Sequence, residues 1–187
     1  MTLALTLFLC WLSLWLLNKI KPQASRNSKL YCLLLLAPLY IYPFVYSPVW
    51  ALRGLTGDLS ILSMFLLISA LHQQLQGKFL INKQERRFLP WFVTLLGITF
   101  YPLALGLGNI DPYAWGYADL YMVITLLLLA TYALWRHYYF TGLMLLGVLL
   151  AWDMQLLQSV NLWDYLLDPF IVFFYLGRVI KGCFHAR

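Results

Sequence analysis

Residues 2–29 read TLALTLFLCWLSLWLLNKIKPQASRNSK. The apolar run 2–17 is followed by four cations, Lys19, Lys21, Arg26 and Lys29, and no positive charge precedes it. Because no small-residue cleavage site closes the run, we expect it to be retained rather than removed as a signal peptide. Cations that follow a first apolar helix indicate an outside N-terminus. This stretch therefore predicts a membrane helix that enters from the outside.

The composition of the whole chain agrees with a membrane protein. Of its 187 residues, 63% are hydrophobic and 11% are charged, with a mean hydropathy of +0.76. A soluble domain averages about 45–50% apolar and about 25% charged residues. The net charge of +6 occurs in short clusters between apolar runs, a spacing typical of membrane orientation signals and not of a nucleic-acid-binding face. We therefore expect membrane lipids as partners and no nucleic acid.

The apolar runs predict about seven short transmembrane helices. They cover residues 2–17, 30–46, 59–75, 88–107, 119–134, 139–152 and 165–180. A perpendicular span needs roughly 20 residues, so several runs are short, and flanking Trp and Tyr must extend them into the headgroup layer. The sixth run either continues through residues 153–160 or spans only partly. The predicted fold is all-α: a polytopic helix bundle, N-terminus outside and C-terminus inside, in a single transmembrane domain over residues 1–187.

The loop charges support this arrangement. Alternate assignment of the loops places twelve of the thirteen Lys and Arg residues inside, namely Lys19, Lys21, Arg26, Lys29, Lys78, Lys83, Arg86, Arg87, Arg136, Arg178, Lys181 and Arg187. Only Arg53 falls outside. Among the acids only Glu85 lies inside. Since Lys and Arg favour cytoplasmic loops, the split predicts the orientation and supports the helix count. Compactness and the uncleaved, N-out first helix predict an integral protein of a bacterial inner membrane.

The predicted outer face holds the candidate binding residues: Arg53, Asp58, Asp111, Trp115, Asp119, Asp164 and Asp168. In one interpretation Arg53 holds a lipid phosphate or a partner's acidic group, because guanidinium matches such oxygens bidentately. In the other, Arg53 pairs with Asp58 across a turn and the aromatic residues form an interfacial belt. Asp111-Pro112 and Asp168-Pro169 share a helix-start pattern, in which Asp caps and Pro occupies the first turn.

Catalytic and cofactor chemistry finds little support. Cys10, Cys32 and Cys183 form no CxxC pair, and none lies in a predicted outer segment, so we expect no structural disulfide. No charged residue falls at mid-span, which disfavours a proton or ion pump. The span-three serines Ser60, Ser63 and Ser69 have no outer His to act as a base. We expect no catalytic residue, no metal site and no cofactor, and an enzyme is disfavoured.

Residues 53–60, RGLTGDLS, contain Gly54-x-x-x-Asp58-Leu59-Ser60. This pattern resembles a Gly-x-x-x-Asp-Leu-Ser element in the membrane domains of bacterial phosphoglycerol and phosphoethanolamine transferases. Those enzymes carry their metal, nucleophile and substrate site in a large outer domain that has no counterpart in this sequence. The resemblance therefore implies a membrane anchor without the catalytic part.

Three functions remain open from the sequence. The first is a non-catalytic accessory or assembly subunit of an envelope complex, with a membrane-protein partner or a second copy of the chain. The second is a lipid- or headgroup-handling protein with its site at the outer face. The third is a small transporter or channel lined by the proline-containing second span and the serine-containing third span.

Overall fold

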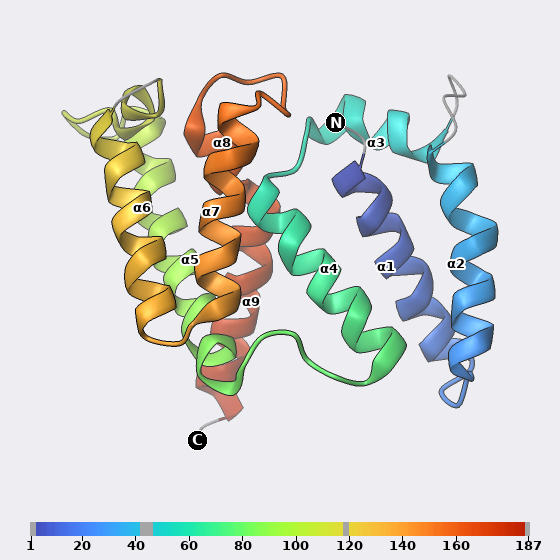
Figure 1. Ribbon diagram of the computed structural model, residues 1–187. Helices are drawn as coiled ribbons and strands as arrows, with labels where there is room; N and C mark the ends of the chain where they lie inside the picture. The colour runs from blue at the N-terminus through green and yellow to red at the C-terminus, as the bar shows by residue number, and fades with distance from the viewer. Residues whose placement is uncertain (1–2, 42–46, 118–119, 186–187) are drawn as a thin grey trace. The chain divides into compact units, whose positions relative to one another are not determined.

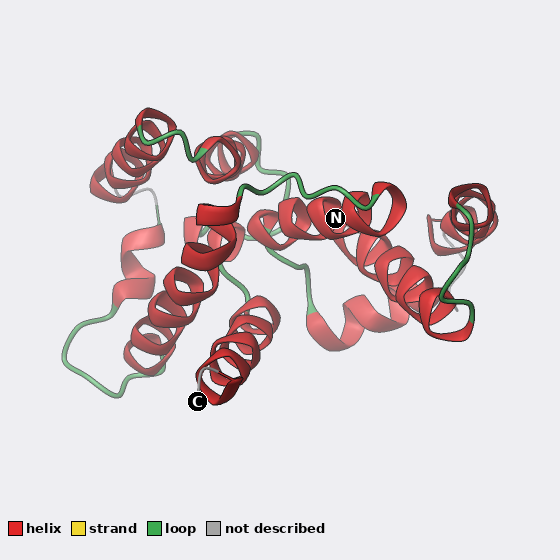
Figure 2. Ribbon diagram, turned by 90° about the horizontal axis from the view of Figure 1, so that it is seen from below, coloured by secondary structure: helices red, strands yellow, loops and turns green. Residues whose placement is uncertain are grey.

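The computed structural model describes residues 3–41, 47–117 and 120–185, and over these ranges every regular element is a helix (Figure 2). The elements in chain order are α1 (Leu3–Ile20), α2 (Arg26–Ile41), α3 (Pro48–Thr56), α4 (Ile61–Gln76), α5 (Lys83–Ala104), the 3₁₀ helix η1 (Pro112–Gly116), α6 (Leu120–Trp135), α7 (Tyr139–Asp153), α8 (Leu162–Leu166) and α9 (Pro169–His185). The prediction of an all-α chain is confirmed for the described residues.

Each predicted apolar run lies largely within a helix. Two helices, α1 and α5, are long and apolar enough to cross a membrane, whereas α4, α6 and α7 are apolar but shorter. The sixth run does not continue as helix, because α7 ends at Asp153 and a turn follows. Pro38 lies inside α2 and Pro102 inside α5, whereas Pro43, in the proline-containing second run, lies outside the described residues.

Two short helices were not predicted. Residues 48–56, expected as an outer loop, form α3, with Pro48 in its first turn. Residues 162–166 form α8, so the seventh run is divided between α8 and α9. Both helices begin at a side-chain cap, Ser47 for α3 and Asn161 for α8, because each cap accepts a backbone N–H that the helix start leaves unsatisfied.

The chain forms two compact units. Unit 1 comprises Met1–Leu59 and Ser63–Leu80, and unit 2 comprises Ser60–Leu62 and Ile81–Arg187. Each unit is described by itself below, with the labels of Figure 1.

Unit 1 is held together by apolar contacts between α1 and its neighbours. One buried cluster combines Ala4 and Leu5 of α1 with Val49 of α3 and Leu59. A second cluster combines Cys10 and Leu14 of α1 with Leu71 of α4, and α2 side chains pack against it. The α1 and α2 helices run antiparallel (Figure 1), and the hydroxyls of Ser13 and Tyr40 are 2.9 Å apart between them.

Unit 2 contains two antiparallel helix pairs, α6 with α7 and α5 with α9 (Figure 1). Gly97 of α5 lies directly against Val172 of α9, and a Cβ at position 97 would overlap the Val172 methyl groups. Small residues commonly permit such close approach between membrane helices. His137, in the left-handed region at φ 61°, reverses the chain between α6 and α7.

Candidate functional site

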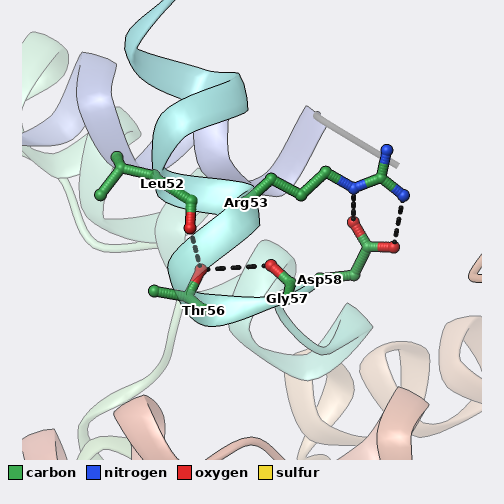
Figure 3. Close-up of polar contacts among 5 residues, drawn as sticks. All are labelled: Leu52, Arg53, Thr56, Gly57 and Asp58. Carbon is green, nitrogen blue, oxygen red and sulfur yellow. Dashed lines mark hydrogen bonds and ion pairs between the residues drawn. The ribbon is translucent and has the colours of Figure 1, made fainter.

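Arg53 and Asp58, both in unit 1, form a two-pronged ion pair (Figure 3). The Arg53 Nε lies 3.0 Å from Asp58 Oδ1, and Nη2 donates a 3.1 Å hydrogen bond to Oδ2. Gly57 follows the last residue of α3 and adopts a positive φ of 71°, a conformation that glycine allows. The chain therefore turns back after α3, and Asp58 reaches Arg53. This is the pairing across a turn that the sequence allowed.

The ion pair changes what Arg53 offers to a ligand. Its side chain is 18% exposed and that of Asp58 is 10% exposed, and the guanidinium lies 5.5 Å from the centre of the Trp50 ring. A bidentate pair already satisfies the guanidinium geometry that would recognise a phosphate. A phosphate must therefore compete with the Asp58 carboxylate.

Asp168 occupies a buried position between two helix starts of unit 2. Its Oδ1 accepts the Ile171 N–H at 3.0 Å, as the Asp-Pro pattern predicted for the start of α9. Its Oδ2 accepts the Ser60 N–H at 3.0 Å and the Ser60 hydroxyl at 2.7 Å, just before α4 begins. With 5% of its surface exposed, Asp168 joins two chain segments and does not present its carboxylate at the surface.

Asp164 and Asp111 lie in a second polar cluster of unit 2. The Tyr113 hydroxyl donates to Asp164 Oδ2 at 3.0 Å, and Asp111 Oδ1 accepts the Tyr113 N–H at 2.9 Å. The latter bond caps η1 and confirms the helix-start prediction for Asp111-Pro112. Partial burial, followed by the bond to Asp164, raises the pKa of Tyr113 above its ordinary value.

Asn161 and Trp163 fix this cluster from the α8 side. The Asn161 side-chain amide donates to the Tyr113 carbonyl at 2.9 Å, and its Oδ1 accepts the Trp163 N–H at 2.9 Å. The Trp163 indole N–H donates to the Pro112 carbonyl at 2.8 Å, and its ring packs 4.3 Å from the centre of the Phe100 ring. Together these contacts hold η1 against α8.

The other predicted outer-face residues are less engaged. Trp115 is half exposed, and Asp111 is exposed. Asp119 lies outside the described residues. The structure therefore brings together Arg53 with Asp58, and Asp111 with Asp164 through Tyr113; these are two separate arrangements in different units.

A buried carboxylate that the sequence left unassigned lies at the other end of α5. Glu85 is 1% exposed. Its Oε2 accepts the Asn82 N–H at 3.2 Å, which completes a capping box, and its Oε1 accepts the Thr141 N–H at 2.8 Å in the first turn of α7. The spacing Asn82-x-x-Glu85 is typical of a capping box and is recognisable in the sequence. No local sequence pattern predicts the bond from Glu85 to α7.

Among the described carboxylates, Glu85, Asp111 and Asp168 accept backbone N–H groups, Asp58 binds a guanidinium and Asp164 accepts a tyrosine hydroxyl. Within residues 3–41, 47–117 and 120–185, no group of three or more His, Cys, Asp or Glu side chains is arranged to hold a metal ion. Most of these carboxylates accept hydrogen bonds at the starts of helices and so fix the positions of the helix ends. Comparison of the chain with protein-family models, curated proteins and solved structures found no match.

Proposed function

We propose that this chain is a multi-pass protein of a bacterial inner (cytoplasmic) membrane, with about seven short spans, and acts as a non-catalytic accessory or assembly subunit of an envelope complex. The supporting observation is the way exposed threonines occur on apolar helix faces. The hydroxyls of Thr99, Thr125 and Thr131 are exposed, and each donates to the carbonyl four residues earlier at 2.7–2.9 Å. In hydrocarbon no water can hydrogen-bond to a hydroxyl, and a bond to a carbonyl of the same helix satisfies it.

The surface around these threonines is strongly apolar. On α6, large exposed side chains include Tyr121, Leu128, Tyr132 and Trp135, the last 74% exposed. Soluble monomers rarely expose apolar patches of such extent, so lipid or a protein partner must cover them. This need for a cover supports the role as a subunit, as does the use of Asp111 and Asp168 at helix starts.

Two measurements test the proposal. Extraction of membranes with alkaline carbonate should leave the chain in the pellet, and its release into the supernatant would contradict the membrane assignment. Purification in mild detergent should then yield a second protein in fixed stoichiometry that remains bound through gel filtration. Recovery of the chain alone, with lipid only, would contradict the subunit role while leaving the membrane assignment intact.

A lipid-headgroup site at Arg53 is the second candidate function, because the guanidinium keeps part of its surface exposed beside Trp50. Under this alternative, R53A removes retention of an anionic lipid, whereas D58N increases it by removing the competing carboxylate. Equal retention by wild type and both variants would exclude the site.

A further inference from the structure

Six cations lie at one end of unit 2, which we call the basic end: Lys83, Arg86 and Arg87 of α5, Arg136 of the α6–α7 turn, and Arg178 and Lys181 of α9. We infer that the basic end binds the phosphate headgroups of anionic phospholipids. The inference rests on the proposed membrane location and places lipid recognition at the predicted cytoplasmic side.

The first two elements of the basic end are joined by direct contacts. The Asn82 side-chain amide donates to the His137 carbonyl at 3.3 Å, and Glu85 accepts the Thr141 N–H at 2.8 Å. The rings of Phe88 and Tyr138 stack with their centres 6.3 Å apart. The start of α5 and the α6–α7 turn therefore form one rigid surface.

The helix register brings α9 to the same level. Gly97 contacts Val172 where α5 and α9 cross in antiparallel directions (Figure 1). Lys181 lies nine residues after Val172 in α9, and Phe88 lies nine residues before Gly97 in α5. At a rise of 1.5 Å per residue, each is about 13.5 Å along its helix from the Gly97–Val172 contact. Lys181 thus lies level with Phe88, one residue after Arg87.

Cations outnumber acids at this end. Glu85 is the single acid in residues 81–89, 134–140 and 176–185, and both of its carboxylate oxygens accept backbone N–H groups. Lys83, Arg87, Arg136 and Arg178 are exposed. Basic clusters next to a membrane surface attract anionic headgroups, and guanidinium groups bind phosphate oxygens in a bidentate manner.

Aromatic side chains favour a lipid over a free anion. Phe88, Trp135 and Tyr139 are exposed beside these cations, and such rings typically lie at the level of the headgroups. A lipid can contact the cations through its phosphate and the rings through its glycerol and upper acyl region. A soluble phosphate would use only the cations.

The α1–α2 turn of unit 1 provides a matched comparison. It also carries four cations, Lys19, Lys21, Arg26 and Lys29, without an acid. Here they belong to one helical hairpin: Lys19 lies 5.5 Å from the centre of the Trp15 ring, and Lys29 donates to the Gln74 carbonyl at 3.0 Å. Loss of two lysines from this turn lowers the net charge of the chain by the same amount as loss of two arginines from the basic end.

The test compares R87Q/R136Q with K19Q/K21Q in the full chain, after reconstitution in nanodiscs of phosphatidylcholine with or without phosphatidylglycerol. Retention of phosphatidylglycerol is measured by mass spectrometry after transfer to detergent. We expect about tenfold lower retention for R87Q/R136Q and a smaller change for K19Q/K21Q. An unfolding temperature of R87Q/R136Q in detergent equal to that of the wild type shows that loss of the fold is not the cause. Retention by R87K/R136K assigns the binding to positive charge alone, whereas its loss assigns the binding to the bidentate guanidinium geometry.

Two results would overturn the inference: equal losses in the two double variants, or no preference of the wild type for phosphatidylglycerol. Displacement of the lipid by glycerol phosphate at equal concentration would assign the site to a free phosphate ester instead and would also contradict it. If the chain does not enter nanodiscs at all, the proposed membrane location fails, which is a distinct result.

Discussion

The Glu85 carboxylate accepts the backbone N–H of Thr141 at 2.8 Å, across 56 residues of sequence. Its other oxygen accepts the Asn82 N–H in the capping box of α5. One buried side chain therefore caps the first turns of both α5 and α7. Backbone N–H groups at helix starts have no partner within the helix, so a single carboxylate that serves two of them couples the positions of the two helices.

E85A should destabilise unit 2 by about 2–4 kcal/mol, because it leaves two helix starts without a charged acceptor. Thermal unfolding in detergent, followed by circular dichroism, measures the change. Q84A is the matched control: Gln84 is the exposed neighbour of Glu85, and we expect a change within about 0.5 kcal/mol. Equal effects of the two substitutions would mean that the two caps contribute nothing.

Asp168 and Ser60 should behave as a coupled pair. D168A removes an acceptor for three hydrogen bonds, and we expect a loss of about 2–4 kcal/mol, whereas S60A removes one of them and costs about 1 kcal/mol. The double variant should cost less than the sum of the two. D153A, an exposed acid on the same unit, serves as the control. Strict additivity in the cycle would contradict the contact.

The sequence predicted the local parts of this arrangement better than its long-range parts. The run 139–152 coincides with α7, because the apolar residues of a helix are continuous in sequence. Asp168-Pro169 predicts the start of α9, because capping depends on adjacent residues. The Ser60–Asp168 bond joins positions 108 residues apart, and no local pattern encodes such a contact.

The short helices show a second limit. Residues 48–56 and 162–166 lack an apolar run of helical length, so they were assigned to loops or merged with a neighbouring span. For the candidate site, Arg53–Asp58 was one of two interpretations and was found. The sequence predicts Asp168 at the outer face, and no local pattern predicts that its side chain is buried.

G97A should weaken the contact between α5 and α9. A Cβ at position 97 would overlap the branched Val172 side chain, which has little freedom to move away, and we expect a loss of about 1–3 kcal/mol. Gly177 in α9 meets open space, so G177A should be neutral or stabilising by up to about 1 kcal/mol. Unfolding in detergent compares the two, and a G97A protein as stable as G177A would exclude the close approach.

The Tyr113–Asp164 bond should give a defined alkaline dependence of stability. The pKa of Tyr113 is raised above its ordinary value by burial and by this bond. A raised pKa means that the contribution to stability is complete below the unfolded pKa of about 10 and is lost as the pH rises through the folded pKa. The difference in Tm between wild type and Y113F should therefore be constant from neutral pH to about pH 9 and shrink above pH 10. A difference that grows above pH 10 would contradict the hydrogen bond.

The proposed membrane arrangement is tested most directly by cysteine accessibility at Lys83, where α5 begins, and at Asp111, the N-cap of η1. In a chain in which Cys10, Cys32 and Cys183 are replaced by Ser, K83C and D111C are labelled in intact cells with a reagent that does not cross the membrane. We predict that D111C reacts from outside, whereas K83C reacts only after the cells are opened. Reaction of both positions from the same side would contradict the account.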